Sequence, residues 1–216
     1  MKRVLLAAFL CAPLFGVVAA PTEATGTDPF TQGSAEAGAA KAAPCAACHG
    51  PGGNSSNPEW PKLAGQNARY TFEQLQHFKN GVRKNPLMAP QAAGLSERDM
   101  RDLAVYFAQQ PASPGVASEN AVARAEPLYR GGDAKRGIPA CAACHLPDGA
   151  GVAAAGYPRI GGQHARYTAV ALRRLRAEHA AASEPLPGNL GVMAAVAAKL
   201  SDEDIDALAS YINGLQ

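Results

Sequence analysis

Aromatic side chains and net charge are both scarce in this chain. Phe, Trp and Tyr make up 6% of the 216 residues, although 47% of the residues are hydrophobic. Alanine-rich stretches carry much of the apolar share, so the large side chains that usually fill a core are few and another group is expected to fill it. The formal charge of +2 comes from Lys2 and Arg3. Without these two residues no net positive field remains to attract phosphates, which disfavours a nucleic-acid-binding role.

A long apolar run occurs at the N-terminus. Lys2 and Arg3 precede an almost unbroken apolar stretch over residues 4–18, which is followed by small residues. This order is typical of a secretory signal peptide, so we expect residues 1–20 to be removed and the protein to be exported. A retained membrane anchor is the alternative. The apolar run is shorter than the roughly 20 residues that cross a bilayer, which favours the signal peptide.

Four of the five cysteines lie beyond this segment, in two copies of the motif Cys-Ala-Ala-Cys-His. The motif residues are Cys45, Cys48 and His49 in the first copy, and Cys141, Cys144 and His145 in the second. Cys-x-x-Cys-His is the attachment signature of a c-type haem. Two thiols three residues apart share one face of a helix, where both can add to the haem vinyl groups. The sequence therefore predicts two covalent haem groups, with His49 and His145 as axial ligands of the iron.

Three other uses of the cysteines fit the sequence less well. A single zinc site would need pairs roughly 15 to 20 residues apart, whereas Cys45 and Cys141 are offset by 96 residues. A thioredoxin-like redox motif would need a βαβ context, and no alternating β-branched runs flank either motif. Disulfide bonds in an exported protein would not explain the histidine after each pair.

An internal repeat extends through much of the chain. The sequence of residues 63–71, Leu-Ala-Gly-Gln-Asn-Ala-Arg-Tyr-Thr, returns at 160–168 as Ile-Gly-Gly-Gln-His-Ala-Arg-Tyr-Thr. A second match pairs residues 95–107 with residues 200–212 at a larger offset. The second copy must therefore contain an insertion, and residues 183–189 have the Pro, Gly and Asn content of an inserted loop.

The repeats predict an all-α fold in two halves. Apolar periodicity and Ser-x-x-acid N-cap signals predict helices over residues 69–79, 96–109, 166–180 and 201–214. A Pro-rich break predicts a linker. We therefore expect an N-terminal domain over 21–110, a linker over 111–119 and a C-terminal domain over 120–216.

The sixth ligand of each iron is expected to be a methionine. Met88 and Met193 each stand seven residues before the leucine that opens the second repeated segment, so they occupy equivalent positions. Met100 instead aligns with Ile205, which indicates a core residue. We therefore expect Met88 and Met193 to be the axial ligands, carried by loops rich in Pro and Gly that cross the haem face.

Other equivalent residues are expected to surround the haems. Each half offers a proline, an apolar residue, an arginine and a tyrosine, namely Pro61, Leu63, Arg69 and Tyr70, and Pro158, Ile160, Arg166 and Tyr167. Each proline can bring a backbone carbonyl to the second ring nitrogen of the axial histidine, and the apolar residue would then lie against the haem edge. The arginine and the tyrosine are candidates to hold the propionates. The alternatives are prolines that only start turns and an exposed first helical turn. The remaining histidines, His77, His164 and His179, fall at non-equivalent positions and are expected at the surface.

These features together resemble the periplasmic dihaem cytochrome c4 family, in which two class I cytochrome c domains are fused. The resemblance rests on the two haem motifs, on Lys62-Leu-Ala-Gly-Gln66, on Leu128-Tyr-Arg-Gly-Gly132, on Tyr157-Pro-Arg-Ile-Gly-Gly-Gln163 and on the methionine segments. It implies His/Met coordination of both irons and a pseudo-twofold pairing of the domains. It also implies periplasmic electron transport from a quinol-oxidising complex or a dehydrogenase to a terminal oxidase, with possible peripheral membrane association.

His/Met coordination would favour an electron carrier over an enzyme. Both axial positions would be closed to a substrate, and the soft thioether would favour Fe(II). Three alternatives stay open. A membrane-anchored oxidase subunit would retain the apolar run over residues 4–18. A cytochrome subunit of a flavoprotein dehydrogenase would have the same haem chemistry. A dihaem peroxidase-like enzyme would need one open or differently ligated iron.

Overall fold

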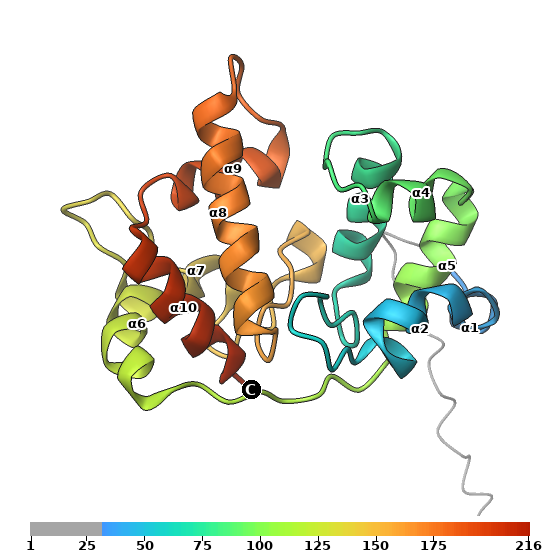
Figure 1. The fold of residues 1–216 in the computed structure, drawn as a ribbon, viewed down its shortest axis with the longest axis horizontal. Coiled ribbons are helices and arrows are strands. Elements are labelled where there is room, and N and C mark those ends of the chain that lie inside the picture. Colours follow the sequence, from blue (N-terminus) through green and yellow to red (C-terminus); the bar gives the residue numbers. More distant parts are fainter. Residues whose placement is uncertain (1–31) are drawn as a thin grey trace, which may run out of the picture.

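The computed structural model describes residues 32–216, which form two helical domains joined by an extended segment (Figure 1). Within this range the chain forms helices and two isolated β-bridges but no strand, so the predicted all-α class is confirmed. The expected signal peptide and the alternative anchor over residues 4–18 lie outside the described residues. Over residues 32–216 we find no helix with both the length and the apolar character needed to cross a membrane.

The N-terminal domain is built around the packing of its last helix. Its elements are α1 (Ala35–Lys41), α2 (Ala43–His49), the 3-10 turn η1 (Pro51–Gly53), α3 (Ala68–Lys79), α4 (Met88–Ala93) and α5 (Glu97–Ala108). Helix α5 packs against α1 and α3, and α3 packs against α4. Leu103 and Phe107 of α5 are buried in a small core cluster that Cys45 and Leu63 also contact. The haem motif thus borders the core of its own domain.

The C-terminal domain repeats this plan, with longer helices at α6 (Glu119–Gly131), α8 (Ala165–Ala181) and α9 (Gly188–Ala197). Its other elements are α7 (Ala142–His145), η2 (Ala153–Ala155) and α10 (Asp202–Asn213). Helix α10 packs against α6 and α8, and α8 packs against α9. The rings of Tyr129 and Tyr211, with centroids 5.4 Å apart, join α6 to α10 within one larger core cluster.

The sequence repeat has its counterpart in the helices. Helices α3 and α8 begin at equivalent residues, but α3 has 12 residues and α8 has 17. The insertion therefore lengthens the helix as well as the loop, and α9 begins at Gly188, inside the expected loop over 183–189. Between α5 and α6 the chain has no helix, and this segment runs along the lower edge of both domains in Figure 1.

A capping box begins the final helix of each domain. The Ser201 hydroxyl accepts a hydrogen bond from the Asp204 backbone N–H, and the Asp204 carboxylate accepts one from the Ser201 N–H; Ser96 and Asp99 do the same in α5. Asp204 is also bonded by Arg136 and Arg124, at 2.5 and 2.9 Å. Burial alone would raise the pKa of the Asp204 carboxyl, but these hydrogen bonds lower it to about 2. The carboxylate therefore stays ionised and fixes the start of α10.

Candidate haem sites

In the N-terminal domain the motif residues lie on α2. Cys45 is half-buried and Cys48 is exposed, and both are free thiols. His49, the last residue of the helix, is only 7% exposed. Its Nδ1 donates a hydrogen bond of 2.8 Å to the carbonyl of Pro61. This bond orients the imidazole ring and leaves Nε2 free to bind a metal.

The C-terminal domain has the same arrangement at the single turn of α7, with Cys141 as the N-cap residue of this helix. Cys141 and Cys144 are half-buried free thiols, and His145 is 5% exposed. The Nδ1 of His145 donates a hydrogen bond of 3.0 Å to the carbonyl of Pro158. Both proline carbonyls therefore lie where the sequence indicated, and both imidazoles have the same orienting contact.

Burial shifts the pKa of the motif histidine and of the first motif cysteine in each domain. It lowers the pKa of His49 and of His145, and the hydrogen bonds to the proline carbonyls oppose this change only in part. Neutral imidazole is the form that binds metals. Burial also raises the pKa of the Cys45 thiol, and it raises that of Cys141 to about 11. These two thiols are therefore protonated at neutral pH in the chain without haem.

The expected sixth ligands lie on short helices, whereas the sequence predicted loops. Met88 is the first residue of α4, and Met193 lies inside α9. The loop prediction was wrong because alanine-rich segments follow both residues and continue as helix. Met100 is 2% exposed inside α5, as a core residue should be. Iron coordination by Met88 and Met193 stays a prediction.

Apolar contacts link the motifs to the residues that were expected at the haem edge. Leu63 packs in the same cluster as Cys45. Ile160 and Met193 pack against the core cluster that Cys141 also contacts. The thiol, the apolar residue and the thioether of the C-terminal domain thus share one region, although they come from three separate segments.

The donor set in each domain fits a c-type haem. It consists of two free thiols one helical turn apart, a buried imidazole with one free nitrogen, and a methionine on a separate helix, α4 or α9. Across residues 32–216, no three His, Cys, Asp or Glu side chains gather closely enough to hold a metal ion, so the four cysteines do not form one zinc site. In the described part of the chain, the buried Oγ1 of Thr71 on α3 has no hydrogen-bond partner. An added group beside α3 could satisfy it.

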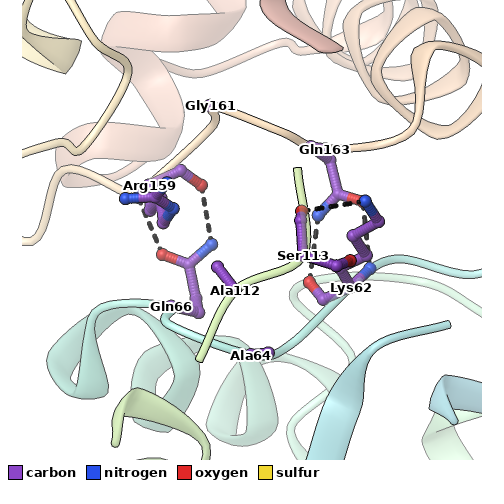
Figure 2. Close-up of a pocket in the computed structure, with 8 residues that line it drawn as sticks. All are labelled: Lys62, Ala64, Gln66, Ala112, Ser113, Arg159, Gly161 and Gln163. Carbon is purple, nitrogen blue, oxygen red and sulfur yellow. Dashed lines mark hydrogen bonds between the residues drawn. The ribbon is translucent and has the colours of Figure 1, made fainter. Parts of the chain in front are cut away.

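Equivalent glutamines join the two domains. The side-chain amide of Gln66 donates to the carbonyl of Arg159 and accepts from its N–H, both at 2.8 Å. Gln163 does the same with the backbone of Lys62, at 3.0 and 2.9 Å. Figure 2 shows the two amides facing the opposite domain around a small cavity. This reciprocity is what a pseudo-twofold between the domains produces.

The arginines expected at the propionates also make contacts between the domains. Arg69 pairs with Glu73 on its own helix and donates a hydrogen bond of 2.6 Å to the carbonyl of Ala154 in the C-terminal domain. Arg166 pairs with Glu59 of the N-terminal domain. These partners are remote in sequence, so the repeat alone could not indicate this structural role. Contact of either arginine with a propionate stays a prediction.

His164 corrects another expectation from the sequence. It is half-buried at the interface, where its Nε2 donates a hydrogen bond of 2.8 Å to the carbonyl of Ser55. Its counterpart Asn67 donates one of 2.5 Å to the carbonyl of Tyr157. His164 differs from its counterpart in residue type, but the two side chains have the same role. Non-equivalence in the repeat was therefore a poor reason to place it at the surface.

Tyr70 and Tyr167 come close to each other beside Arg83, which the sequence did not single out. Arg83 donates a hydrogen bond of 3.0 Å to the Tyr167 hydroxyl, and its guanidinium lies 4.6 Å from the ring centroid of Phe78. Burial raises the pKa of Tyr70, and the nearby Tyr167 adds to this effect. Arg83 lies outside the repeated segments, so no sequence signal marked it. Contact of the tyrosines with propionates stays a prediction.

Comparisons with known proteins agree with this architecture. A family model for cytochrome c matches residues 35–111 and 134–216. Cytochrome c4 of Pseudomonas aeruginosa is 48% identical over 183 residues, which cover 85% of this chain and 89% of that protein. The thiosulfate dehydrogenase electron acceptor of Stutzerimonas stutzeri strain A1501 is 36% identical over 208 residues, which cover 92% of each.

A solved structure agrees at the level of the fold. The crystal structure of reduced recombinant cytochrome c4 from Pseudomonas stutzeri matches with a TM-score of 0.78 at 44% identity, covering 85% of this chain and 100% of that one. The similarity thus includes both domains and their pairing. The chain belongs to the cytochrome c4 family of electron-transfer proteins and binds two covalent haem c groups.

Proposed function

We propose that the protein carries single electrons between redox proteins of the periplasm, with His49 and Met88 as one axial pair and His145 and Met193 as the other. The observation that carries the proposal is the pair of buried imidazoles, each oriented by a proline carbonyl and each following two free thiols. When bound, each haem supplies a reversible one-electron Fe(II)/Fe(III) couple.

The residues around the two haem sites suit an electron carrier. The proline carbonyls hold the imidazoles in one orientation, so the ligand does not have to reorganise between oxidation states. When haem is bound, the thioethers of Met88 and Met193 would close the sixth position of each iron and would favour the reduced state. The four cysteines attach the cofactor covalently, so it is not lost between encounters with partners.

The domain interface supports a relay inside one molecule. Gln66 and Gln163 each bond both backbone groups of a residue in the opposite domain, which holds the two sites in a fixed relation. A fixed relation keeps the distance between two redox centres constant while the protein diffuses. We infer that the protein holds two electrons or passes one from domain to domain.

The proposed downstream partner is a terminal oxidase, and the proposed upstream partner is a quinol-oxidising complex or a dehydrogenase. A second candidate function is that of an electron acceptor dedicated to one dehydrogenase. The 36% identity to the thiosulfate dehydrogenase electron acceptor over 92% of both chains favours it. A flavoprotein dehydrogenase as the donor is the other form of this alternative. Periplasmic location rests on the signal-peptide pattern and on the family.

Mixing the pre-reduced protein with oxidase-containing membranes tests the proposal. We expect rapid oxidation of both haems, which cyanide inhibition of the oxidase should abolish. In parallel, the oxidised protein is mixed with thiosulfate dehydrogenase and thiosulfate. Fast reduction by the dehydrogenase without oxidation by the membranes would contradict delivery to an oxidase and support the dedicated acceptor.

A further inference from the structure

The peptide group between Pro61 and Lys62 carries two hydrogen bonds that connect the domains. Its carbonyl accepts a bond of 2.8 Å from Nδ1 of His49, within the N-terminal domain. Its N–H donates a bond of 2.9 Å to Oε1 of Gln163, which belongs to the C-terminal domain. A single peptide group therefore connects the motif histidine of one domain to a side chain of the other.

The same connection runs in the reverse direction. The carbonyl of Pro158 accepts a bond of 3.0 Å from Nδ1 of His145. The N–H of Arg159, in the same peptide group, donates a bond of 2.8 Å to Oε1 of Gln66 in the N-terminal domain. Figure 2 shows both glutamines with these backbone partners. Each domain thus supplies a glutamine to the other domain. This glutamine contacts the peptide group that accepts the hydrogen bond of the motif histidine.

The two hydrogen bonds of one peptide group strengthen each other. When the N–H donates, electron density shifts toward the carbonyl oxygen, which becomes a better acceptor. A better acceptor draws the Nδ1 proton away from the imidazole and makes Nε2 a stronger donor to the metal. Stronger donation stabilises ferric iron and lowers the reduction potential. A glutamine on the N–H side can therefore alter the potential without touching the histidine.

The surroundings of both glutamines favour this effect. Gln66 is 8% exposed and Gln163 is 9% exposed, so water competes little for their hydrogen bonds. The Nε2 of Gln163 donates to the Lys62 carbonyl at 3.0 Å, and its Oε1 also accepts from the His164 N–H at 3.0 Å. The amide is therefore fixed with its oxygen toward the Lys62 N–H, because reversing it would lose all these bonds.

We propose that Gln163 tunes the haem of the N-terminal domain and that Gln66 tunes the haem of the C-terminal domain. Each glutamine acts through the backbone peptide that binds the histidine of the opposite domain. Both are positioning residues, since neither contacts the histidine itself. The inference rests on the proposed function through the assignment of His49 and His145 as axial ligands.

The matched variants Gln163→Met and Gln66→Met test this crossed dependence in the protein with both haems. Methionine keeps a similar volume and removes the amide. In Gln163→Met the bond from His49 to Pro61 weakens, so we expect the reduction equilibrium of the N-terminal haem to shift about threefold toward Fe(II). The C-terminal haem should change much less. Gln66→Met should shift the C-terminal haem toward Fe(II) and should change the N-terminal haem much less.

Two readouts assign the effect to individual haems. Haem-methyl NMR signals followed through a redox titration give the potential of each haem. In the fully reduced, diamagnetic protein, the Nδ1–H proton signals of His49 and His145 report the hydrogen bonds directly. We expect the His49 signal to move in Gln163→Met and the His145 signal to move in Gln66→Met. If Gln163→Met does not fold, Gln163→Asn, which is polar but too short to reach the Lys62 N–H, should give the same crossed shift.

Two outcomes would overturn the proposal. One is a larger shift at the haem of the domain that carries the variant. The other is an equal shift of both haems in every variant, which would show only a loosened interface. Failure of the proposed function looks different, because the unaltered protein would then lack the Met-to-ferric-iron absorption or the two histidine Nδ1–H signals.

Discussion

Replacing Met88 or Met193 with alanine is expected to remove about half of the Met-to-ferric-iron absorption, because each residue is proposed to serve one of two irons. The potential of the affected haem should also fall, on the order of 0.1 V, since the soft thioether that stabilises Fe(II) is lost. Absorption spectra of the oxidised protein and a redox titration of each variant measure both effects.

The matched control is Met100→Leu. Met100 is 2% exposed in α5, and the equivalent position in α10 is the fully buried Ile205. A buried methionine that aligns with isoleucine fills the core, so leucine should leave both Met-to-iron signals intact at a cost below about 1.5 kcal/mol in stability. Loss of one signal in Met100→Leu would mean that the repeat was aligned in the wrong register.

Changing Cys141 and Cys144 together to alanine is expected to give a protein with one haem in place of two. No thioether bond can then form in the C-terminal domain, whose core cluster also contacts Ile160 and Met193. Without the haem plate, these residues face a cavity, and the free energy of unfolding of this domain should fall by about 3 to 5 kcal/mol or more. Intact mass after denaturation counts the haems. Thermal unfolding measures the loss of stability of the C-terminal domain.

The corresponding pair in the other domain provides the control. Changing Cys45 and Cys48 to alanine should also leave one haem, now in the C-terminal domain, and should destabilise the N-terminal domain instead. A double variant that keeps two covalent haems would contradict the attachment sites. So would an unaltered protein whose mass showed one haem, no haem or a zinc ion.

Local sequence signals predicted α3, α5, α8 and α10 well. Ser96 and Ser201, each followed three residues later by an aspartate, form the capping boxes that begin α5 and α10. The helices expected from 69 and 166 begin one residue earlier, at Ala68 and Ala165. These features depend on residues close in the chain, so the sequence displays them directly.

The methionine segments show where local reasoning failed. Proline and glycine near Met88 and Met193 suggested loops, but α4 and α9 form there. The alanines after each methionine favour helix, and tertiary packing against α3 and α8 stabilises these short helices. The composition around each methionine did not reveal that a neighbouring helix would pack against the segment and stabilise it as a helix.

The domain interface was beyond the reach of sequence reasoning. Lys62 and Gln163 are 101 residues apart, and Gln66 and Arg159 are 93 apart, so only the pairing of whole domains brings them together. One signal was present. Glutamine occupies the same position in both copies of the repeat, and a polar residue kept in two copies of a fold points to a shared contact. The repeat alone could not identify its partner.

Addition of carbon monoxide to the fully reduced, unaltered protein at neutral pH tests the central claim most directly. If a histidine and a methionine close both irons, the spectrum should stay nearly unchanged, and an anaerobic titration of the same sample should show two one-electron steps or one broadened step. Rapid binding of carbon monoxide by half of the haem would reveal an open iron, contradict the carrier and support a peroxidase-like enzyme.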